Sequence, residues 1–296
     1  MEYRRRRRRP NAGRQRNTLL GAAICILLVS AAVVYLVGIS DAGTWLAEHV
    51  VAPVFRTLGV GGTAEEGTDA QESAAGQTGA RLLELPELRC YALQMGVYAS
   101  ETNAEKQAVE LQSVGAGGYI LQEEDRYRVL AAAYATEDDL QQVRSQLSDE
   151  GLDSAGHVIA SLPCRLVVTG TESQVETLSA VLDGLVGLQG QLTELAIEFD
   201  REQLAVEAGK SSLAALVRTV EGYLADVAAV STEQPVLACL SDCCRSILAQ
   251  FEKADALPED DRAAFTAYLK YTCIHCAEAY CDFCDTVAAL GGTDSA

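Results

Sequence analysis

The feature that most constrains this chain is a stretch of 21 residues without a charged side chain, residues 19–39. A helix rises about 1.5 Å per residue, so a helix of this length crosses the roughly 30 Å hydrocarbon core of a bilayer. We therefore expect a transmembrane helix over residues 19–39. A cleaved signal peptide is the competing interpretation, but its apolar region is shorter, about 7–15 residues, and is followed by a small-residue cleavage site.

An arginine-rich block precedes this stretch and predicts its topology. Residues 1–18 contain eight arginines and one glutamate, whereas the rest of the chain holds 15 basic and 41 acidic groups. Arginine-rich flanks stay in the cytoplasm. We therefore expect a cytoplasmic tail at residues 1–18, a single pass through the cell membrane, and an acidic extracytoplasmic portion.

A nucleic-acid-binding or nuclear-targeting tail is the alternative interpretation of the arginines. The acidic remainder of the chain argues against nucleic acid as a partner, because phosphate contacts need Lys and Arg. The neighbouring apolar stretch explains the arginines more simply, and it makes the lipid bilayer an expected partner.

Residues 40–86 should connect the membrane to the folded part of the chain. In residues 40–60, apolar side chains such as Trp45, Val50 and Phe55 recur at near-helical spacing, which predicts a juxtamembrane amphipathic segment on the bilayer surface. Residues 61–86 are rich in Gly, Ala, Thr and Glu, and we interpret them as a flexible linker.

Residues 87–163 carry alternating strand and helix patterns. Tyr98, Leu111 and Gly115 recur 36 positions later as Tyr134, Leu147 and Gly151, so the segment consists of two similar halves. A βαββαβ unit of this kind folds as one four-stranded antiparallel sheet with both helices on one face, the ferredoxin-like arrangement, and the other face stays open. The expected strands are 91–98, 118–121, 126–133 and 156–161, and the expected helices are 103–114 and 137–150.

These residues resemble the SPOR (sporulation-related repeat) domain. The resemblance implies an α+β, ferredoxin-like domain that binds septal peptidoglycan and prefers glycan strands stripped of their stem peptides. This sequence has Ala132-Ala133-Tyr134 where a Gly-Pro-Phe turn is usual in the family. The similar positions are Gln94-x-Gly96-x-Tyr98, Ala104-x(6)-Leu111-x(3)-Gly115, Tyr127-Arg128-Val129, Tyr134 and Leu147-x(3)-Gly151.

Strand alternation selects the candidate glycan contacts. Residues that alternate with the apolar positions should point to the open face, where an amide and a guanidinium suit sugar hydroxyls and tyrosines offer stacking planes. The alternative is that the tyrosines pack at strand ends and that Arg128 is a solvated charge. Electrostatics should not drive binding, because the exported part is strongly acidic. The candidates are Gln94, Gly96, Tyr98, Tyr119, Arg128, Leu130 and Tyr134.

Residues 164–296 are expected to form an all-α, cysteine-rich helical domain that engages another protein. Ser173 and Glu176 have the spacing of a capping box, and leucines follow them at helical spacing to Phe199. Further helices are expected over residues 213–227, over 236–251, and from Pro258 to the glycines at 291–292. Four helices of this length favour a four-helix bundle.

The ten cysteines raise the question of redox state. Because the fourth strand should lie beside the first, Cys90 and Cys164 are expected to come close enough for a disulfide in an oxidising compartment. Two Cys-x-x-Cys pairs lie in the helical domain, but only four residues separate them, too few for a zinc ribbon. Reduced core residues, interhelical disulfides and metal ligands remain open interpretations of Cys273, Cys276, Cys281 and Cys284.

No catalytic signature is visible, so we expect a binding protein without a cofactor and not an enzyme. The chain has three scattered histidines and lacks the HExxH, GxSxG, P-loop and dinucleotide motifs. The alternative is a redox-sensing or metal-sensing cysteine-rich helical module tethered to the wall, and a wall hydrolase is a distant third. The sequence thus predicts a membrane-anchored peptidoglycan-binding protein of the division or sporulation septum.

Overall fold

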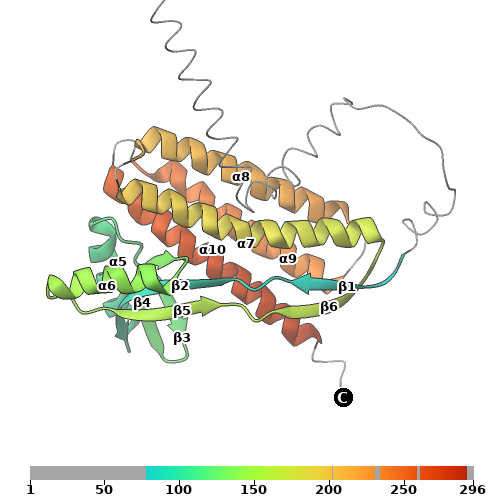
Figure 1. Cartoon of the computed structure of the whole chain (residues 1–296), viewed down its shortest axis with the longest axis horizontal. Helices are drawn as coiled ribbons and strands as arrows, with labels where there is room; N and C mark the ends of the chain where they lie inside the picture. The colour runs from blue at the N-terminus through green and yellow to red at the C-terminus, as the bar shows by residue number, and fades with distance from the viewer. Residues whose placement is uncertain (1–77, 202, 231–233, 259–260, 292–296) are drawn as a thin grey trace, which may run out of the picture. The chain divides into compact units, whose positions relative to one another are not determined.

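The computed structural model describes residues 78–201, 203–230, 234–258 and 261–291, which belong to one compact unit (Figure 1). Within these ranges, no helix is long and apolar enough to cross a membrane. The expected transmembrane helix at 19–39, the juxtamembrane segment and the linker up to residue 77 lie outside the described residues.

The predicted βαββαβ unit is present. All neighbouring strands are antiparallel in the order β3-β4-β2-β5, so the fourth strand of the unit lies beside the first, as expected. Both helices pack on one face of this sheet around Leu93, Val129 and Leu140. The elements are β2 (Arg89–Tyr98), α5 (Glu101–Ser113), β3 (Tyr119–Glu123), β4 (Arg126–Tyr134), α6 (Glu137–Asp149) and β5 (Ala155–Ala160).

The internal repeat is confirmed in the way that the two helices end. Gly115 follows α5 with φ of 84°, and Gly151 follows α6 with φ of 79°. In each case the next amide donates a hydrogen bond of 2.9 Å back to a leucine carbonyl, that of Leu111 or of Leu147. A residue with this left-handed backbone conformation at the end of a helix is usually glycine, because glycine has no Cβ. The two halves therefore use the same device to turn from helix to strand.

A two-stranded ribbon extends from the sheet and differs from the sequence prediction. β1 (Gly79–Leu85) pairs antiparallel with β6 (Cys164–Gly170). Residues 79–85 were assigned to the linker and 164–170 to the helical domain, and both assignments are wrong. Leu83 and Leu85 explain the difference, because both are almost fully buried in the main hydrophobic core.

The predicted four-helix bundle follows the ribbon. It consists of α7 (Glu172–Asp200), α8 (Val206–Ala229), α9 (Pro235–Phe251) and α10 (Arg262–Gly291), with a short 3-10 helix, η2 (Glu252–Ala256), after α9. Each helix packs on the next, and α10 closes the bundle against α7. The capping box of α7 joins Thr171 and Gln174, so the predicted pair Ser173 and Glu176 is wrong.

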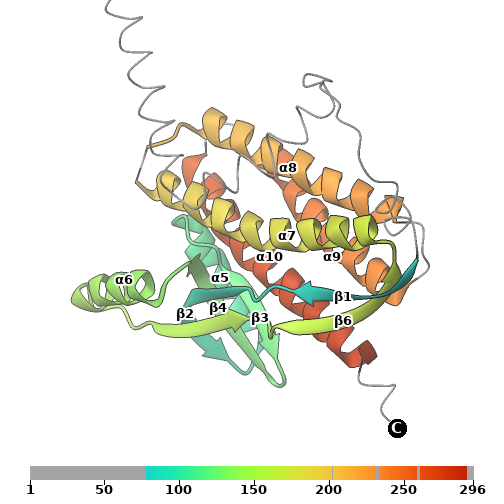
Figure 2. The same ribbon diagram turned by 45° about the vertical axis from the view of Figure 1, so that its right-hand side comes forward.

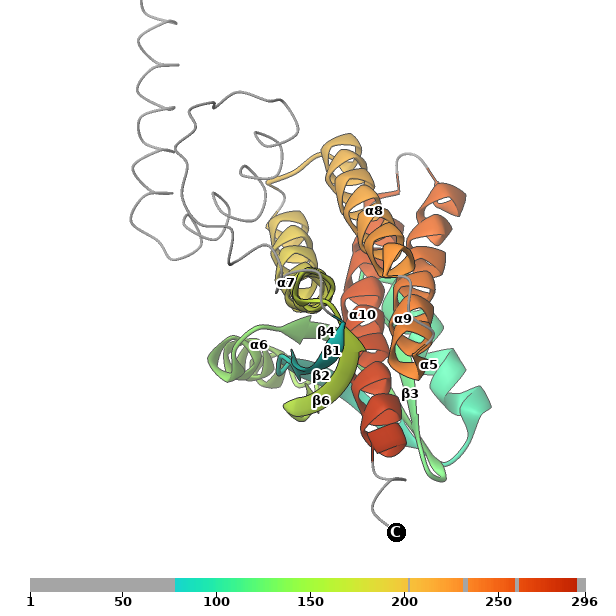
Figure 3. The same cartoon turned by 90° about the vertical axis from the view of Figure 1, so that its right-hand side faces the viewer.

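Helix α10 also covers the second face of the sheet, which is the main departure from the prediction. It contacts β2, β3, β4 and β5 in addition to α7 and α9. Figure 2 shows α10 running diagonally behind β1, and Figure 3 shows it between the β1–β6 ribbon and α9. The middle of α10 is accordingly buried, as at Cys273, Ile274 and Ala277. One core includes Cys90, Leu130 and Ile159 of the sheet together with Leu182 and Leu269 of the bundle, so residues 87–163 and 164–296 do not have separate cores.

Candidate functional site

The predicted glycan contacts fall into three different environments. Gln94 and Arg128 lie together on the part of the sheet that α10 leaves uncovered. Tyr119 and Leu130 lie on the same face but underneath α10. Gly96, Tyr98 and Tyr134 lie on the opposite face, beside α5 and α6. Gln94, Arg128 and Leu130 share one face as predicted, but α10 covers Leu130, and the prediction that Gly96 lies on this face is wrong.

Gln94 and Arg128 belong to a polar cluster that spans the uncovered face, which we call the polar strip: Gln94, Glu123, Arg128 and His157. Arg128 donates from Nη1 to Oε1 of Gln94 at 2.6 Å and from Nε to Oε2 of Glu123 at 2.5 Å. Nε2 of His157 lies 3.6 Å from the other oxygen of Glu123. The four residues come from β2, β3, β4 and β5, so the strip crosses the whole sheet.

The electrostatics of the strip are nearly balanced. Burial lowers the pKa of His157, although Glu123 opposes this, so the imidazole is neutral near pH 7. Arg128 and Glu123 then form its single pair of opposite charges, with 28% and 39% of their side chains exposed. Glu278 of α10 lies at the border of the strip, and burial, followed by Asp282 and Glu123, raises its pKa to about 7. The site therefore offers exposed polar groups with no large net charge.

Leu130 and Tyr119 are core residues. The side chain of Leu130 is fully buried between its own strand, β4, and the helical bundle. The ring centroid of Tyr119 lies 4.9 Å from that of Tyr271 and 6.4 Å from that of His275, both on α10. Burial raises the pKa of Tyr119, which agrees with this packing. A glycan could reach Leu130 only if α10 left the sheet, and the half-buried ring of Tyr119 already packs against α10.

A β-bulge explains why Gly96 and Tyr98 lie on the face of the sheet opposite to the predicted one. The pairing register of β2 with β4 shifts twice: Ala131 of β4 has no partner between the pairs of Leu93 and Gln94, and Met95 of β2 has none between those of Gln94 and Gly96. An extra residue inverts every later side chain of a strand. The Tyr98 hydroxyl accordingly donates to Oε1 of Gln107 on α5 at 3.1 Å.

Tyr134 lies on the same side as Tyr98, at the other end of the sheet. It packs with the cluster under α5 and α6, opposite Tyr91 on β2. Burial, followed by the charges of Asp200 and Asp139, raises the pKa of Tyr134 to about 12. The alternative interpretation, in which tyrosines pack at strand ends, describes Tyr98 and Tyr134.

Glu123 and His157 are the members of the strip that the sequence did not identify. The third strand was expected to end at residue 121, which placed Glu123 in a polar turn. In the structure β3 continues to Glu123, and the turn centres on Glu124, whose φ is 48°. The alternation of β5 could have assigned His157, because it faces the same way as Ile159, which lies in the core under α10.

The predicted disulfide between Cys90 and Cys164 does not fit the strand register. Cys90 pairs with Ile159, and Cys164 pairs with Leu85 of the ribbon, so the two cysteines are five positions apart along the paired strands. Both are free thiols. A disulfide needs Cα atoms within about 7 Å. The prediction is wrong because residues 79–85 form a strand that occupies the place beside Cys164.

The other described cysteines lie in or against the main core. Cys273, Cys276 and Cys284 of α10 are buried, and Cys281 is half-buried. Burial raises the pKa of all four thiols, that of Cys281 to about 12. Within the ranges that the structure covers, no three His, Cys, Asp or Glu side chains are grouped to hold a metal ion. This arrangement favours the interpretation of reduced core residues among the three that the sequence left open.

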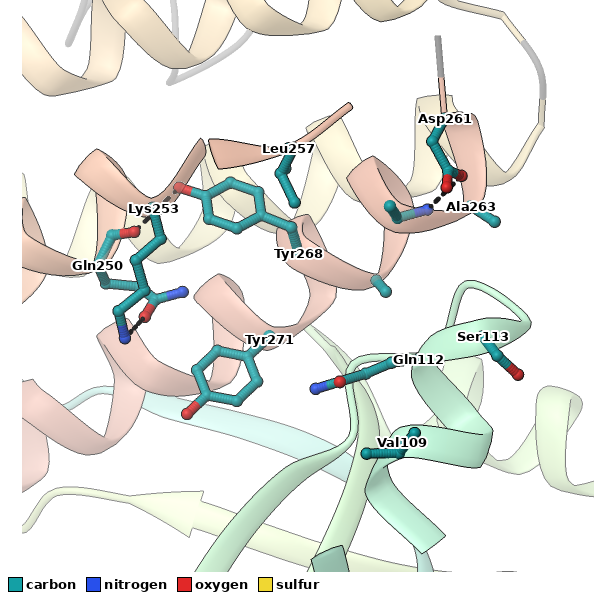
Figure 4. A pocket seen from close by; sticks show the side chains of 12 residues that line it. Val109, Gln112, Ser113, Gln250, Lys253, Leu257, Asp261, Ala263, Tyr268 and Tyr271 are labelled. Carbon is teal, nitrogen blue, oxygen red and sulfur yellow. Dashed lines mark hydrogen bonds between the residues drawn. The ribbon is translucent and has the colours of Figure 1, made fainter. Parts of the chain in front are cut away.

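A groove of about 530 Å³ lies between α5, η2 and α10 (Figure 4). Its polar side chains are largely engaged within the protein: Lys253 donates to Gln250 at 2.8 Å, and Gln112 donates to the Gly117 carbonyl at 3.2 Å. Much of the remaining wall is apolar, from Val109, Leu257, Ala263, Ala264, Ala267 and Tyr268. A sugar needs partners for many hydroxyls, so the strip is the better candidate for glycan contact.

The match to a family model concerns the βαββαβ unit. Residues 90–157 match the family model of the SPOR domain. Among solved structures, the solution structure of the peptidoglycan binding domain of the B. subtilis cell wall lytic enzyme CwlC is similar at 20% identity, with a TM-score of 0.21. That match covers 24% of this chain and 89% of the other. No curated protein matches the chain.

Proposed function

We propose, from the SPOR domain at residues 90–157, that this chain is a membrane-anchored protein that binds peptidoglycan through the polar strip. The preferred ligand is a glycan strand without stem peptides, and the place of action is the division or sporulation septum. The observation that supports this proposal is the Gln94 and Arg128 pair on the uncovered part of the sheet. An amide and a guanidinium supply the donors and the acceptor that sugar hydroxyls need.

Retention on purified sacculi tests the proposal. The full chain in detergent should bind sacculi treated with an amidase, which removes stem peptides, more strongly than untreated sacculi. The double variant Gln94→Ala with Arg128→Ala should lose about tenfold or more in affinity, as expected for the loss of charge-assisted hydrogen bonds. The matched control is Arg165→Ala, which removes an exposed strand arginine paired with Glu84 on the ribbon. Equal retention of the double variant and the control would refute the proposed surface.

The septal and membrane parts of the proposal rest on the sequence. A fluorescent fusion of the full chain should gather at division sites, and the same fusion with Arg128→Ala should spread over the whole membrane. Protease added outside spheroplasts should digest the residues after 39 and spare the tail at 1–18, because arginine-rich tails stay in the cytoplasm. If both fusions were spread uniformly over the membrane, the septal part of the proposal would fail and peptidoglycan binding along the whole wall would remain.

The protein partner proposed for the helical region would dock more favourably on the ribbon than on the bundle. Among the described residues, α7, α8 and α9 carry no exposed large apolar side chain, whereas Leu82, Leu162 and Val167 are 53%, 76% and 74% exposed on or beside β1 and β6. Exposed apolar groups on a strand pair favour docking of another protein. Crosslinking from Val167 should therefore capture a partner more readily than crosslinking from exposed positions of α8.

The alternative, a redox or metal sensor, predicts different chemistry. Thiols whose pKa is raised by burial react slowly, because the thiolate is the reactive form. Metal analysis and thiol counting of the purified chain distinguish the two functions. Bound metal, or disulfides that form and break with the redox state of the buffer, would favour the sensor.

A further inference from the structure

The contacts of Glu123 show that the polar strip already holds a carboxylate. One oxygen accepts from Nε of Arg128 at 2.5 Å, and the other lies 3.6 Å from Nε2 of His157. Gln94 accepts from Nη1 of the same guanidinium at 2.6 Å. An arginine and a neutral histidine therefore contact one carboxylate that belongs to the protein itself, and the amide of Gln94 accepts a hydrogen bond from the same arginine.

Glu123 can leave this position without a change in the sheet. It is the last residue of β3, at the edge of the sheet and beside the turn at Glu124. Its side chain is 39% exposed, so rotation about its own bonds carries the carboxylate into water. The Nη2 group of Arg128 makes no hydrogen bond to the described residues. Once Nε is also free, Arg128 can bind an incoming carboxylate through two parallel hydrogen bonds.

The chemistry of the proposed ligand matches this arrangement, and the inference rests on the proposed function. Each muramic acid unit of a glycan strand carries a lactyl group. This group is an amide when a stem peptide is attached and a free carboxylate when the peptide has been removed. We propose that Glu123 occupies the place of this lactyl carboxylate and that the ligand displaces it. The strip then selects stripped glycan through a charged group and not through hydroxyls alone.

The acidity of the chain does not contradict a local carboxylate site. Charges separated by more than about 10 Å are largely screened at physiological salt, whereas Arg128 would contact the ligand directly. Glu278 is the α10 carboxyl group that interacts with Glu123, and its ionised form would oppose a second carboxylate. Since its pKa is about 7, we expect tighter binding at pH 6 than at pH 8.

The test compares the full chain with Glu123→Gln on two kinds of sacculi. Both are stripped of wall polymers and treated with amidase, and in one the carboxylates are then converted to methylamides with carbodiimide. Glu123→Gln should bind the carboxylate sacculi about tenfold more tightly than the wild type, because Arg128 then has no charged partner within the strip, although Gln94 still accepts from its Nη1. This gain should vanish on the methylamide sacculi. Glu84→Gln, which removes an exposed carboxylate paired with Arg165, is the matched control and should show no gain.

The outcomes separate the two proposals. Equal or weaker binding of Glu123→Gln, or a gain that persists on methylamide sacculi, would overturn the displacement of Glu123 and leave peptidoglycan binding intact. If no variant binds any sacculi, the proposed function fails. The carboxylate site is then decided by titrating Glu123→Gln with N-acetylmuramic acid and following the Nε–H resonance of Arg128 by NMR. A shift that N-acetylglucosamine does not produce supports the site, and no shift refutes it.

Discussion

The two parts of one sheet face differ in what they expose. Under α10 the face presents Tyr119, Leu130 and Ile159, which belong to the core or pack against it. Beyond α10 it presents the polar strip, with Arg128 and Glu123 partly exposed. The same strands, and the same alternation, supply both parts. A helix far along the chain, α10, therefore decides which part of the face can meet a ligand.

The largest expected effect comes from Leu130→Ala, which tests the covered part. Loss of a fully buried leucine leaves a cavity, so we expect the free energy of unfolding to fall by about 3 kcal/mol. Urea unfolding of the full chain, followed by circular dichroism, measures it. Leu162→Ala is the control, because Leu162 is 76% exposed, and it should change stability by less than about 0.5 kcal/mol. Equal effects would mean that α10 does not cover Leu130.

The close approach of α10 is tested at Gly117. A Cβ at this position would lie 2.9 Å from the backbone nitrogen of Tyr271 and 3.1 Å from the carbonyl oxygen of Ala131. Because neither backbone atom can move aside, Gly117→Ala should lower the free energy of unfolding by about 2 kcal/mol. Gly222→Ala on α8 is the matched control, since a Cβ added at this position would meet no neighbouring atom within 4 Å. It should raise stability by about 0.5 kcal/mol.

The border between the covered part of the sheet face and the polar strip is tested at Glu278, through the pH dependence of the free energy of unfolding. Its pKa rises from 4.5 in the unfolded chain to about 7 in the folded one. The neutral form is therefore favoured by folding, and this contribution is complete below pH 4.5 and lost as the pH rises through about 7. After a reduction for solvent screening, we expect the free energy of unfolding to fall by about 1.5 kcal/mol over this pH range. Glu278→Gln should remove this loss between pH 5 and pH 8 in urea unfolding.

The matched control for this pH dependence is Glu221→Gln, which changes an exposed residue of α8. It should leave the pH dependence of the wild type unchanged. If Glu278→Gln also follows the wild-type curve, Glu278 is not the group that titrates at the border.

The smallest expected effect tests the inversion of the strand at Met95. Tyr98→Phe removes the hydrogen bond to Gln107 and should lower the free energy of unfolding by about 1 kcal/mol. Retention on amidase-treated sacculi should not change, because Tyr98 faces α5. If retention fell while stability stayed the same, Tyr98 would be a glycan contact, as strand alternation predicts.

Much of the fold could be predicted from local pattern. The period of two along Tyr91–Tyr98 and the period of 3.6 along α5 and α7 reflect which side chains must leave water, so they predict strands and helices well. The repeat from Tyr98 to Tyr134 predicted the antiparallel order of the sheet. β1 was missed because its glycine and alanine start resembles the linker before it.

The candidate site could be predicted only in part. Gln94 and Arg128 were found because they alternate with core residues. Gly96 and Tyr98 were misplaced because a bulge at Met95 inverts the alternation. The glycine at position 96 is the signal that could have indicated it, since an isolated glycine within a strand often marks a bulge. Glu123 was missed because the end of a strand is poorly determined by its own sequence.

Local pattern in the sequence was enough for the helices and for the strands of the βαββαβ unit, for their antiparallel order, for the resemblance at residues 90–157 and for Gln94 and Arg128 on one side of the sheet. The packing of α10 over Leu130 and Tyr119, and the pairing of Glu123 with Arg128, became visible in the folded chain alone. The physical reason is the range of the interactions. Periodicity records which face of an element avoids water, but it does not record which distant element covers that face.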